Sequence, residues 1–473
     1  MRDPVHGFIE LREKSEVDLV NHPAFQRLRR ISQLAMAYLA FPGARHTRFD
    51  HSLGVLHVAN RLVTALEPGL SPDELTHVRL AALCHDIGHG PFSHISEFAF
   101  EACSSTQGET ERIHEGITRE IVKQVLRPEG ILTESQTQEV VSVLSPAMGY
   151  RTVLKDAVSG PLDADKLDYL LRDSYFCGVK YGVYDLDRLV SAITRTDDGD
   201  ASYIGVRADD VPAVDQYALA RHNMNQVYYH KVRRVADAML VRSIVLACEE
   251  GNPDVRKTYV VEEVTREYLD HFLTMDDEGL VHRILACPGK PSSELMRRLL
   301  DRRLVKEVFR EPLYQCGDAG FRESIRTPQG KKELEASLAN QCSKADWEVF
   351  VDLQQGRPLR KGAGEDGPET IFVIDRRGRR NYDEVSPIFR YGPHREEDYV
   401  SVYVPIQGES EGERNQDRSR CEEVARELLR FQADAPRVEQ CPRCGKELPA
   451  RPDGHCKICG LELATKDEQG EEA

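Results

Sequence analysis

Residues 85–94 read HDIGHGPFSH, the densest run of metal-binding and catalytic residue types in this sequence of 473 residues. A neutral imidazole beside a carboxylate suits a first-row divalent ion. An isolated His-Asp pair is more often structural than metal-binding. Here, however, two more histidines follow the pair, and two glycines and a proline interrupt the helix, so that the backbone comes close to a bound group. The run therefore predicts a metal-dependent site.

Two other segments add polar residues of the same kinds. Upstream, residues 45–52 read RHTRFDHS, and downstream, residues 160–173 read GPLDADKLDYLLRD. At helical spacing, Asp165 and Tyr169 share a face, and the leucines of the downstream segment turn toward the core. Asp168 and Arg172 have the spacing of a routine ion pair along a helix. A solvated charged face is the alternative, but Asp165 beside Lys166 and Tyr169 supplies a ligand, a cation and a hydroxyl together.

The rest of the chain predicts a mostly α fold with a small α+β C-terminal region. Apolar residues recur at three- and four-residue spacing from residue 20 to about residue 309. Ser71, followed by Pro72 and Glu74, predicts the start of a helix. Alternating segments at 201–206, 370–375 and 399–406 predict strands of one small sheet. Residues 355–368 and 407–420 are expected to be loops or linkers. We expect a catalytic domain at 1–310, an α+β region at 311–420, and a helix, a small cysteine-containing module and an acidic tail at 421–473.

Composition limits the function classes. The net charge of −16 gives no global attraction for nucleic acid or anionic lipid, so any polyanion must bind a local basic site. Charges lie where a signal peptide needs an apolar segment, and no run reaches the roughly 18 apolar residues of a membrane span. We therefore expect a cytoplasmic protein that does not enter a membrane, with its 12 cysteines reduced.

Four cysteines near the C-terminus have the spacing of a structural zinc site. They are Cys441, Cys444, Cys456 and Cys459, in two CxxCG turns with eleven residues between them. Four thiolates complete a closed tetrahedral zinc site. The tail is therefore predicted to be a zinc ribbon that binds nucleic acid or a protein partner.

The order of the motifs resembles a known family. His51, His85, Asp86 and Asp165 follow the pattern H…HD…D of the HD phosphohydrolase superfamily. The surrounding motifs are DPVHG at 3–7, FQRLR at 25–29, FPGA at 41–44, RFDHSLGV at 48–55 and DADKLDY at 163–169. They resemble the branch that contains the sterile-alpha-motif and HD-domain dNTP triphosphohydrolase and bacterial dNTPases. The resemblance covers roughly residues 2–310.

The resemblance implies roles for individual residues. His51, His85, Asp86 and Asp165 would bind one divalent transition metal (Mn, Fe, Co, Ni or Zn), and Mg would accompany the nucleotide. His94 would be the general acid, Glu97 would orient its ring, and His89 and His114 would contact phosphates. The implied substrate-binding residues are Arg48 and Lys166 for phosphate, Gln33 and Asp173 for the sugar 3′ hydroxyl, Tyr169 against a ribose 2′ hydroxyl, and Tyr228, for which an ordinary packed aromatic is the alternative.

The sequence also departs from the family. Ala220 replaces an arginine that reaches the phosphates, and Met224 replaces a histidine beside the substrate. Cations at positions that match a guanine-nucleotide regulatory site are Arg29, Arg188, Arg207, Lys231, Arg302 and Lys306. Asn21 and Asp209 replace an aspartate and a lysine of that site, which weakens base reading and phosphate binding. We expect a dimer or tetramer in which guanine nucleotides activate weakly or not at all.

The sequence therefore predicts a metal-dependent enzyme that cleaves deoxynucleoside triphosphates to deoxynucleoside and inorganic triphosphate. The alternative enzyme is a phosphodiesterase or exonuclease that acts on single-stranded nucleic acid, because the same metal centre can attack an internal phosphodiester. A scaffold that binds nucleotide without catalysis is the third possibility.

Overall fold

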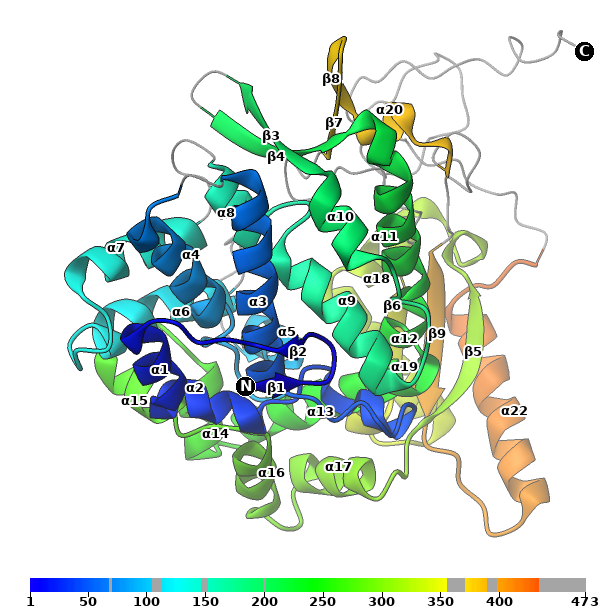
Figure 1. Ribbon diagram of the computed structural model, residues 1–473. Helices are drawn as coiled ribbons and strands as arrows, with labels where there is room; N and C mark the ends of the chain where they lie inside the picture. The colour runs from blue at the N-terminus through cyan, green and yellow to red at the C-terminus, as the bar shows by residue number, and fades with distance from the viewer. Residues whose placement is uncertain are drawn as a thin grey trace, which may run out of the picture. The chain divides into compact units, whose positions relative to one another are not determined.

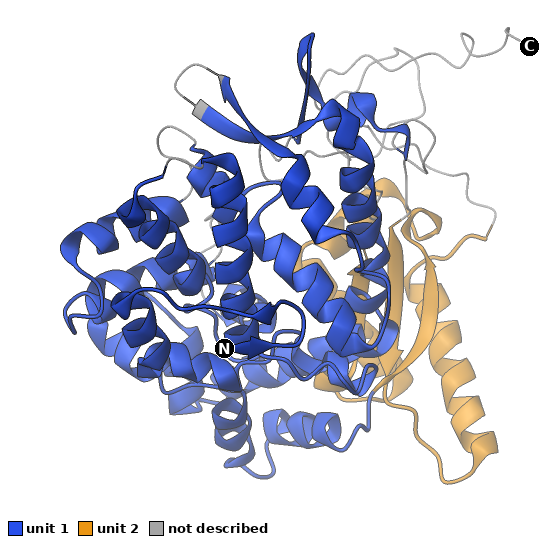
Figure 2. Ribbon diagram, in the orientation of Figure 1, with its two compact units in different colours: residues 1–304, 358–394 blue, residues 305–357, 395–473 orange. Residues whose placement is uncertain are grey.

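A computed structural model describes residues 1–67, 70–103, 113–145, 152–198, 201–354, 371–388 and 398–433 of the chain. The chain divides into two compact units, shown in Figure 2: unit 1 consists of residues 1–304 and 358–394, and unit 2 of residues 305–357 and 395–473. Helices dominate and the sheets are small, which confirms the predicted fold class. The predicted zinc-ribbon cysteines lie outside the described residues. Among those residues, no helix is both long and apolar enough to cross a membrane.

Unit 1 is built mainly of helices (Figure 1). They are α1 (Lys14–Asn21), α2 (Pro23–Gln26), α3 (Arg48–Leu66), α4 (Pro72–Cys84), α5 (His94–Cys103), α6 (Ile113–Ile121), α7 (Glu134–Leu144), α8 (Val153–Val158), α9 (Ala164–Cys177), α10 (Leu186–Ala192), α11 (Val211–Asn223), α12 (Asn225–Tyr228), α13 (Lys231–Glu249), α14 (Pro253–Tyr259), α15 (Arg266–Phe272), α16 (Asp277–Leu285), α17 (Pro291–Leu300) and α20 (Tyr382–Val385). Its strands are β1 (Arg2–Asp3), β2 (Gly7–Phe8), β3 (Ile193–Asp198), β4 (Ala201–Arg207), β7 (Phe372–Asp375) and β8 (Gly378–Asn381).

Local signals explain where the helices of the site begin. Ser71 caps α4 as predicted: its hydroxyl accepts from the backbone N–H of Glu74, whose carboxylate accepts in turn from the Ser71 backbone. Asp163 caps α9 by accepting from the backbone N–H of Lys166 at 2.7 Å. Gly178, in the left-handed conformation with φ 68°, ends the same helix.

The core of unit 1 forms where α3 packs against α4, α8 and α9. Val55 and Leu62 of α3 and Leu167 and Leu170 of α9 are all buried in it. Gly54 lets α3 and α9 come close, because a Cβ there would lie 1.9 Å from Asp168 Oδ1. The packing of α3 on α9 therefore brings together the two helices that contain most of the polar segments at 45–52 and 160–173.

Unit 2 combines a sheet with helices. It contains β5 (Lys306–Pro312), β6 (Phe350–Gln354), β9 (Tyr399–Val404), α18 (Ala319–Arg326), α19 (Pro328–Cys342) and α22 (Glu411–Leu428). The sheet is antiparallel with β9 between β5 and β6. Buried residues of β9, such as Val400 and Val402, share a core with residues of α19 and α22.

Two expectations about local structure were wrong. The three predicted strands exist, but they belong to two sheets rather than one: β4 and β7 lie in the order β3-β4-β7-β8 in unit 1, whereas β9 lies in unit 2. Strand pairing joins distant segments, so alternation along the chain does not reveal which strands pair. Residues 411–420, predicted as a linker, are the first turns of α22. Ser410 and Glu413 form a capping box at the start of this helix. In its later turns, Cys421 and Ala425, which lie one turn apart, are buried.

Candidate active site

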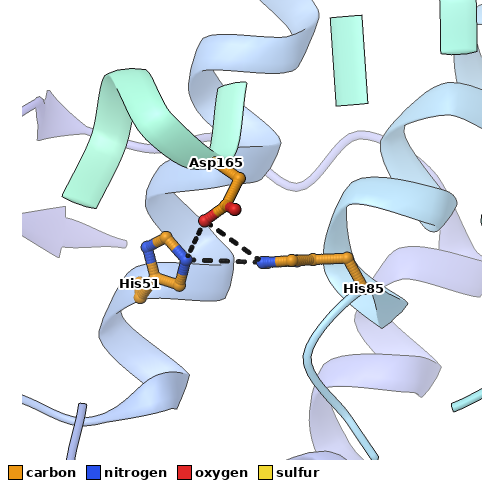
Figure 3. A group of neighbouring side chains, drawn as sticks. All are labelled: His51, His85 and Asp165. Carbon is orange, nitrogen blue, oxygen red and sulfur yellow. Dashed lines mark hydrogen bonds and ion pairs between the residues drawn. The ribbon is translucent and has the colours of Figure 1, made fainter. Parts of the chain in front are cut away.

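Three helices of unit 1 bring the four predicted metal ligands together. His51 lies in α3, His85 and Asp86 follow α4 directly, and Asp165 lies in the first turn of α9. His51 Nε2 is 3.0 Å from Asp165 Oδ1 and 3.3 Å from His85 Nε2 (Figure 3). Asp86 Oδ2 is 3.4 Å from His85 Nε2 and 3.6 Å from His51 Nε2. Side chains from distant parts of the sequence thus point at one place.

The hydrogen bonds of the two imidazoles define their tautomers. His51 Nδ1 donates to Asp168 Oδ2 at 2.8 Å, and His85 Nδ1 donates to the carbonyl oxygen of Ala82 at 2.8 Å. A carbonyl and an ionised carboxylate only accept, so Nδ1 carries a proton in both rings. The two Nε2 atoms face each other and are therefore the atoms that a metal ion between the rings would bind.

The spacing of the donor atoms fits a divalent transition metal. Metal–ligand bonds of about 2.1 Å separate neighbouring ligand atoms by roughly 3.0 Å in an octahedron and 3.4 Å in a tetrahedron. The atoms of His51, His85 and Asp165 lie 3.0, 3.3 and 3.9 Å apart. Two imidazoles with two carboxylates suit first-row metals better than Mg²⁺ or Ca²⁺, which prefer oxygen ligands.

Electrostatics also favour a cation at this place. Burial lowers the pKa of His51, but the carboxylates of Asp165 and Asp168 outweigh burial and raise this pKa to about 10. Burial raises the pKa of Asp86, but Arg48, whose Nη1 lies 2.6 Å from Asp86 Oδ2, and His85 bring it well below its usual range. The carboxylates of Asp86 and Asp168, which are buried, and of Asp165, which is one-third exposed, therefore make a site around His51 that attracts positive charge.

A second group of histidines adjoins the first. Glu97 Oε1 lies 3.2 Å from His94 Nδ1 and also contacts His114 Nδ1. His89 stacks on His114 with ring centroids 3.9 Å apart, and His89 Nε2 lies 3.2 Å from Asp86 Oδ1. The side chain of His94 is 50% exposed, whereas those of His89 and His114 are buried. His94 is therefore the member of this group that is open to a bound molecule, and Glu97 orients its ring.

The loop between these groups holds an unfavourable backbone conformation. Phe92 and Ser93 have φ of 60° and 58°, in the left-handed region that favours glycine. Asp277 of α16 accepts from the backbone N–H of Phe92 at 2.6 Å, and Ser93 Oγ accepts from Arg48 Nε at 2.8 Å. A Cβ at Gly88 would lie 2.4 Å from backbone atoms of α6. Such strain persists where the surroundings impose it, and it concentrates at functional sites.

The predicted phosphate-binding residues Arg48 and Lys166 and the predicted sugar-binding residue Gln33 lie in different environments. Arg48 is buried, and its Nη2 has no hydrogen-bond partner among the described residues. Gln33 is also buried, and within the same part of the chain its Oε1 has no partner. Lys166 Nζ lies 2.7 Å from Asp163 Oδ2 and 2.9 Å from the carbonyl oxygen of Gly160. Arg48, which contacts Asp86, and Gln33 thus each keep an unused polar atom, whereas Lys166 faces Asp163.

Three of the predicted substrate-binding residues, Tyr169, Asp173 and Tyr228, lie close together. Tyr228 donates its hydroxyl proton to Asp173 Oδ2 at 2.8 Å, and His46 Nε2 lies 2.7 Å from Asp173 Oδ1. The rings of Tyr169 and Tyr228 meet edge to face, 6.2 Å apart. Burial raises the pKa of Tyr169 to about 12, so its phenol stays neutral. His46, which lies in the segment at 45–52, was missed as a member of this group.

Four of the predicted regulatory cations have partners within unit 1. Arg188 and Arg207 both pair with Asp210. Arg29 stacks on the ring of Phe49 at 3.5 Å, and Arg302 Nη2 donates to the carbonyl oxygen of Leu39 at 3.3 Å. The other two predicted cations are Lys231, the first residue of α13, and Lys306, the first residue of β5 in unit 2.

Sequence reasoning missed the role of Asp168. The predicted pair with Arg172 exists, at 2.8 Å, but both side chains are buried rather than solvated, and Asp168 also binds the ring of His51. His6, whose Nε2 lies 2.6 Å from Asp168 Oδ1, was missed as well. The signal was available: Asp168 lies one helical turn after Asp165, and His6 belongs to the motif DPVHG.

Comparison with known proteins agrees with this geometry. The sequence-family model of the HD domain matches residues 48–169, and that of the HD associated region matches residues 184–390. The first match begins at α3 and ends in α9, so it contains the four predicted metal ligands.

Relatives occur in bacteria, archaea and animals. The uncharacterized protein YwfO of Bacillus subtilis is 32% identical over 329 residues, which are 66% of this chain and 72% of YwfO. The uncharacterized protein MJ1154 of Methanocaldococcus jannaschii is 29% identical, with 90% and 84% of the two chains covered. The deoxynucleoside triphosphate triphosphohydrolase SAMHD1 of Homo sapiens is 31% identical, over 52% of this chain and 44% of the human enzyme.

Two solved structures resemble the chain over most of its length. A phosphohydrolase from Bacteroides thetaiotaomicron matches with a TM-score of 0.67 and 25% sequence identity. The match covers 85% of this chain and 98% of the Bacteroides chain. A hypothetical protein from Aquifex aeolicus has a TM-score of 0.64 and 26% identity, and covers 89% of this chain and 98% of its own.

Proposed function

Because this chain belongs to the HD domain family of phosphohydrolases, we propose that it is a metal-dependent dNTP triphosphohydrolase. It would cleave a deoxynucleoside triphosphate to deoxynucleoside and inorganic triphosphate. The observation that carries the proposal is the meeting of His51 Nε2, His85 Nε2 and the carboxylates of Asp86 and Asp165 beside the exposed ring of His94.

The metal ion and the phosphate-binding residues would together neutralise the negative charge of the triphosphate. A divalent ion held by the four ligands would polarise a phosphate oxygen and lower the pKa of a water molecule. The unused Nη2 of Arg48 would donate to a phosphate oxygen, and the Arg48 guanidinium stays in place because Asp86 and Ser93 hold its other nitrogens. Lys166 would contribute positive charge from the start of α9.

His94 would protonate the 5′ oxygen of the leaving nucleoside. Glu97 accepts from Nδ1 of the ring, so Nε2 is the atom that would deliver the proton. Burial lowers the pKa of His94, although Glu97 acts in the opposite direction. A bound triphosphate adds negative charge near the ring, so we expect substrate binding to raise this pKa and charge the acid.

The sugar site supports a deoxynucleotide as substrate. Asp173 has a carboxylate oriented by Tyr228 and His46, which suits a hydrogen bond from the 3′ hydroxyl. Tyr169 packs against Tyr228 and would leave no room for a ribose 2′ hydroxyl. The SAMHD1 relatives are deoxynucleoside triphosphate triphosphohydrolases, which agrees with this choice.

Further parts of the proposal concern the rest of the chain. We propose that Cys441, Cys444, Cys456 and Cys459 hold a structural zinc ion, and that the ribbon binds nucleic acid or a protein partner. We also propose a homo-oligomer that works in the cytoplasm.

One assay tests the catalytic proposal. Purified full-length protein is incubated with Mn²⁺, Mg²⁺ or Co²⁺ and with each dNTP, each NTP or single-stranded DNA, and the products are separated by chromatography. We expect inorganic triphosphate and deoxynucleoside from dNTPs and much slower reaction of NTPs. Release of mononucleotides from DNA without triphosphate from dNTPs would instead identify a nuclease, and no reaction with any substrate would support a non-catalytic scaffold.

A further inference from the structure

The carboxylate of Asp168 is fully buried and accepts four hydrogen bonds from protein groups. Its Oδ2 accepts from His51 Nδ1 and from Arg172 Nε, both at 2.8 Å. Its Oδ1 accepts from His6 Nε2 at 2.6 Å and from Arg172 Nη2 at 2.9 Å. These four bonds use the full acceptor capacity of a carboxylate. The orientation of Asp168, and with it the orientation of the His51 ring, is therefore set by residues outside the metal site.

The N-terminal hairpin supplies one side of this support. Asp3 Oδ1 accepts from the backbone N–H groups of Val5 and His6, at 2.9 and 2.8 Å, and so shapes the turn that presents His6. Asp3 Oδ2 lies 2.7 Å from Arg172 Nη1. The side chains of Asp3 and His6 are only 7% and 3% exposed, whereas Phe8, at the end of the same hairpin, is 64% exposed. The hairpin thus turns its two polar side chains inward, onto the Asp168–Arg172 pair.

We propose that His6 and Asp3 are positioning residues for the metal centre, and this inference rests on the proposed metal-dependent function. His6 acts on Asp168 directly, and Asp3 acts through Arg172. Together they fix the carboxylate that holds the proton of His51 on Nδ1 and leaves Nε2 as the metal-binding atom. Partners of this kind change metal affinity by roughly 10- to 100-fold when they are removed.

The proposal differs from a purely structural role of the hairpin. If the hairpin only fastened the N-terminus, loss of His6 would lower the stability of the protein with and without metal by the same amount. If His6 positions His51, its loss lowers metal affinity even where the metal-free protein remains folded. A side chain that only donates a hydrogen bond at the same distance should then restore the affinity. Glutamine, whose amide nitrogen replaces His Nε2 as the donor, provides that test.

The experiment compares variants of the full chain. They are His6→Ala, the conservative His6→Gln, Asp3→Asn, and the control Phe8→Ser, which alters the exposed end of the same hairpin. The affinity for Mn²⁺ or Co²⁺ is measured by competition with a chelator, and the visible spectrum of the Co²⁺ form reports the coordination geometry. The melting temperature of the metal-free protein reports folding.

We expect His6→Ala to bind metal about 10- to 100-fold more weakly than the wild type, with an altered Co²⁺ spectrum. His6→Gln should lie close to the wild type, Asp3→Asn should lose less than His6→Ala, and Phe8→Ser should be unchanged. Wild-type metal affinity in folded His6→Ala overturns the inference. If His6→Ala does not fold, Asp3→Asn decides: unchanged affinity in that variant overturns it. A wild-type protein that binds no transition metal overturns the proposed function instead.

Discussion

Replacement of Gly54 by alanine should separate two helices that carry proposed metal ligands. Gly54 lies in α3, one turn after His51, and a Cβ at this position would be 1.9 Å from Asp168 Oδ1 and 2.3 Å from Arg172 Nη2. Ordinary contacts between such atoms are about 3.4 Å, so α3 and α9 must move apart by on the order of 1 Å. Because Asp165 and Asp168 belong to α9, the movement acts directly on the site.

The size of the effect follows from opposing contributions. Alanine favours a helix over glycine by about 1 kcal/mol. Overpacking costs about 1 to 3 kcal/mol, and disturbance of the buried Asp168–Arg172 pair adds to it, since breaking such a pair costs about 3 to 5 kcal/mol. We expect a net loss of about 2 kcal/mol or more in the free energy of unfolding. A displacement of about 1 Å among catalytic groups lowers turnover by roughly 100-fold.

The assay measures urea denaturation, metal content and dNTP hydrolysis of Gly54→Ala beside a matched control. The control is Gly116 in α6, where the atom nearest to an added Cβ, Arg119 Nη2, lies 3.9 Å away. Gly116→Ala should therefore stabilise the protein by up to about 1 kcal/mol and leave hydrolysis unchanged. A Gly54→Ala protein with wild-type stability and metal content would refute the role of this close approach.

The other predictions concern the catalytic residues, pH, the tail and regulation. Replacing His85 and Asp86 together by alanine should remove bound transition metal and hydrolysis while circular dichroism keeps its helical signal, whereas His94→Ala should keep the metal and lose turnover by roughly 10²- to 10⁴-fold; equal loss of metal in His94→Ala would instead make His94 a ligand. Burial raises the pKa of Glu97, but His114 and His94 lower it well below its ordinary 4.5, so its contribution to stability is present above pH 4.5 and is lost as the pH falls further. Urea denaturation between pH 7 and pH 3 should therefore show a smaller loss of stability in Glu97→Gln than in the wild type, and equal losses would contradict the assignment. Truncation after Asp434 should leave dNTP hydrolysis intact while the zinc content measured by mass spectrometry falls by one ion per chain; a folded but inactive product would make the tail part of substrate capture. Added GTP or dGTP at sub-millimolar concentration should change the initial rate on dCTP little, and a tenfold increase with a shift from dimer to tetramer in light scattering would show that the cations suffice for activation.

Local patterns predicted much of the site because the chemistry itself is locally encoded. The RFDHSLGV motif, the His85-Asp86 pair and the DADKLDY motif identified candidate ligands, and the structure brings their donor atoms within 3 to 4 Å of one another. Helix starts were equally local: Ser71 caps α4 through atoms only three residues away. The linker prediction at 407–420 failed because it relied on the absence of apolar residues, although the capping box of Ser410 starts a helix without them.

The sequence by itself determined which side chains are proposed as metal ligands, since their order matches the H…HD…D pattern of the family, and it determined the mostly helical fold through apolar periodicity and caps. Only the tertiary structure decided what holds those side chains in place. His6 meets Asp168 across 162 residues, and Asp277 meets Phe92 across 185 residues. A hydrogen bond between such distant residues leaves no periodic trace in the sequence, because each partner satisfies only the local rules of its own segment. The close packing of α3 on α9 at Gly54 brings the ligand-bearing helices together, and the long-range hydrogen bonds then fix the orientation of the side chains.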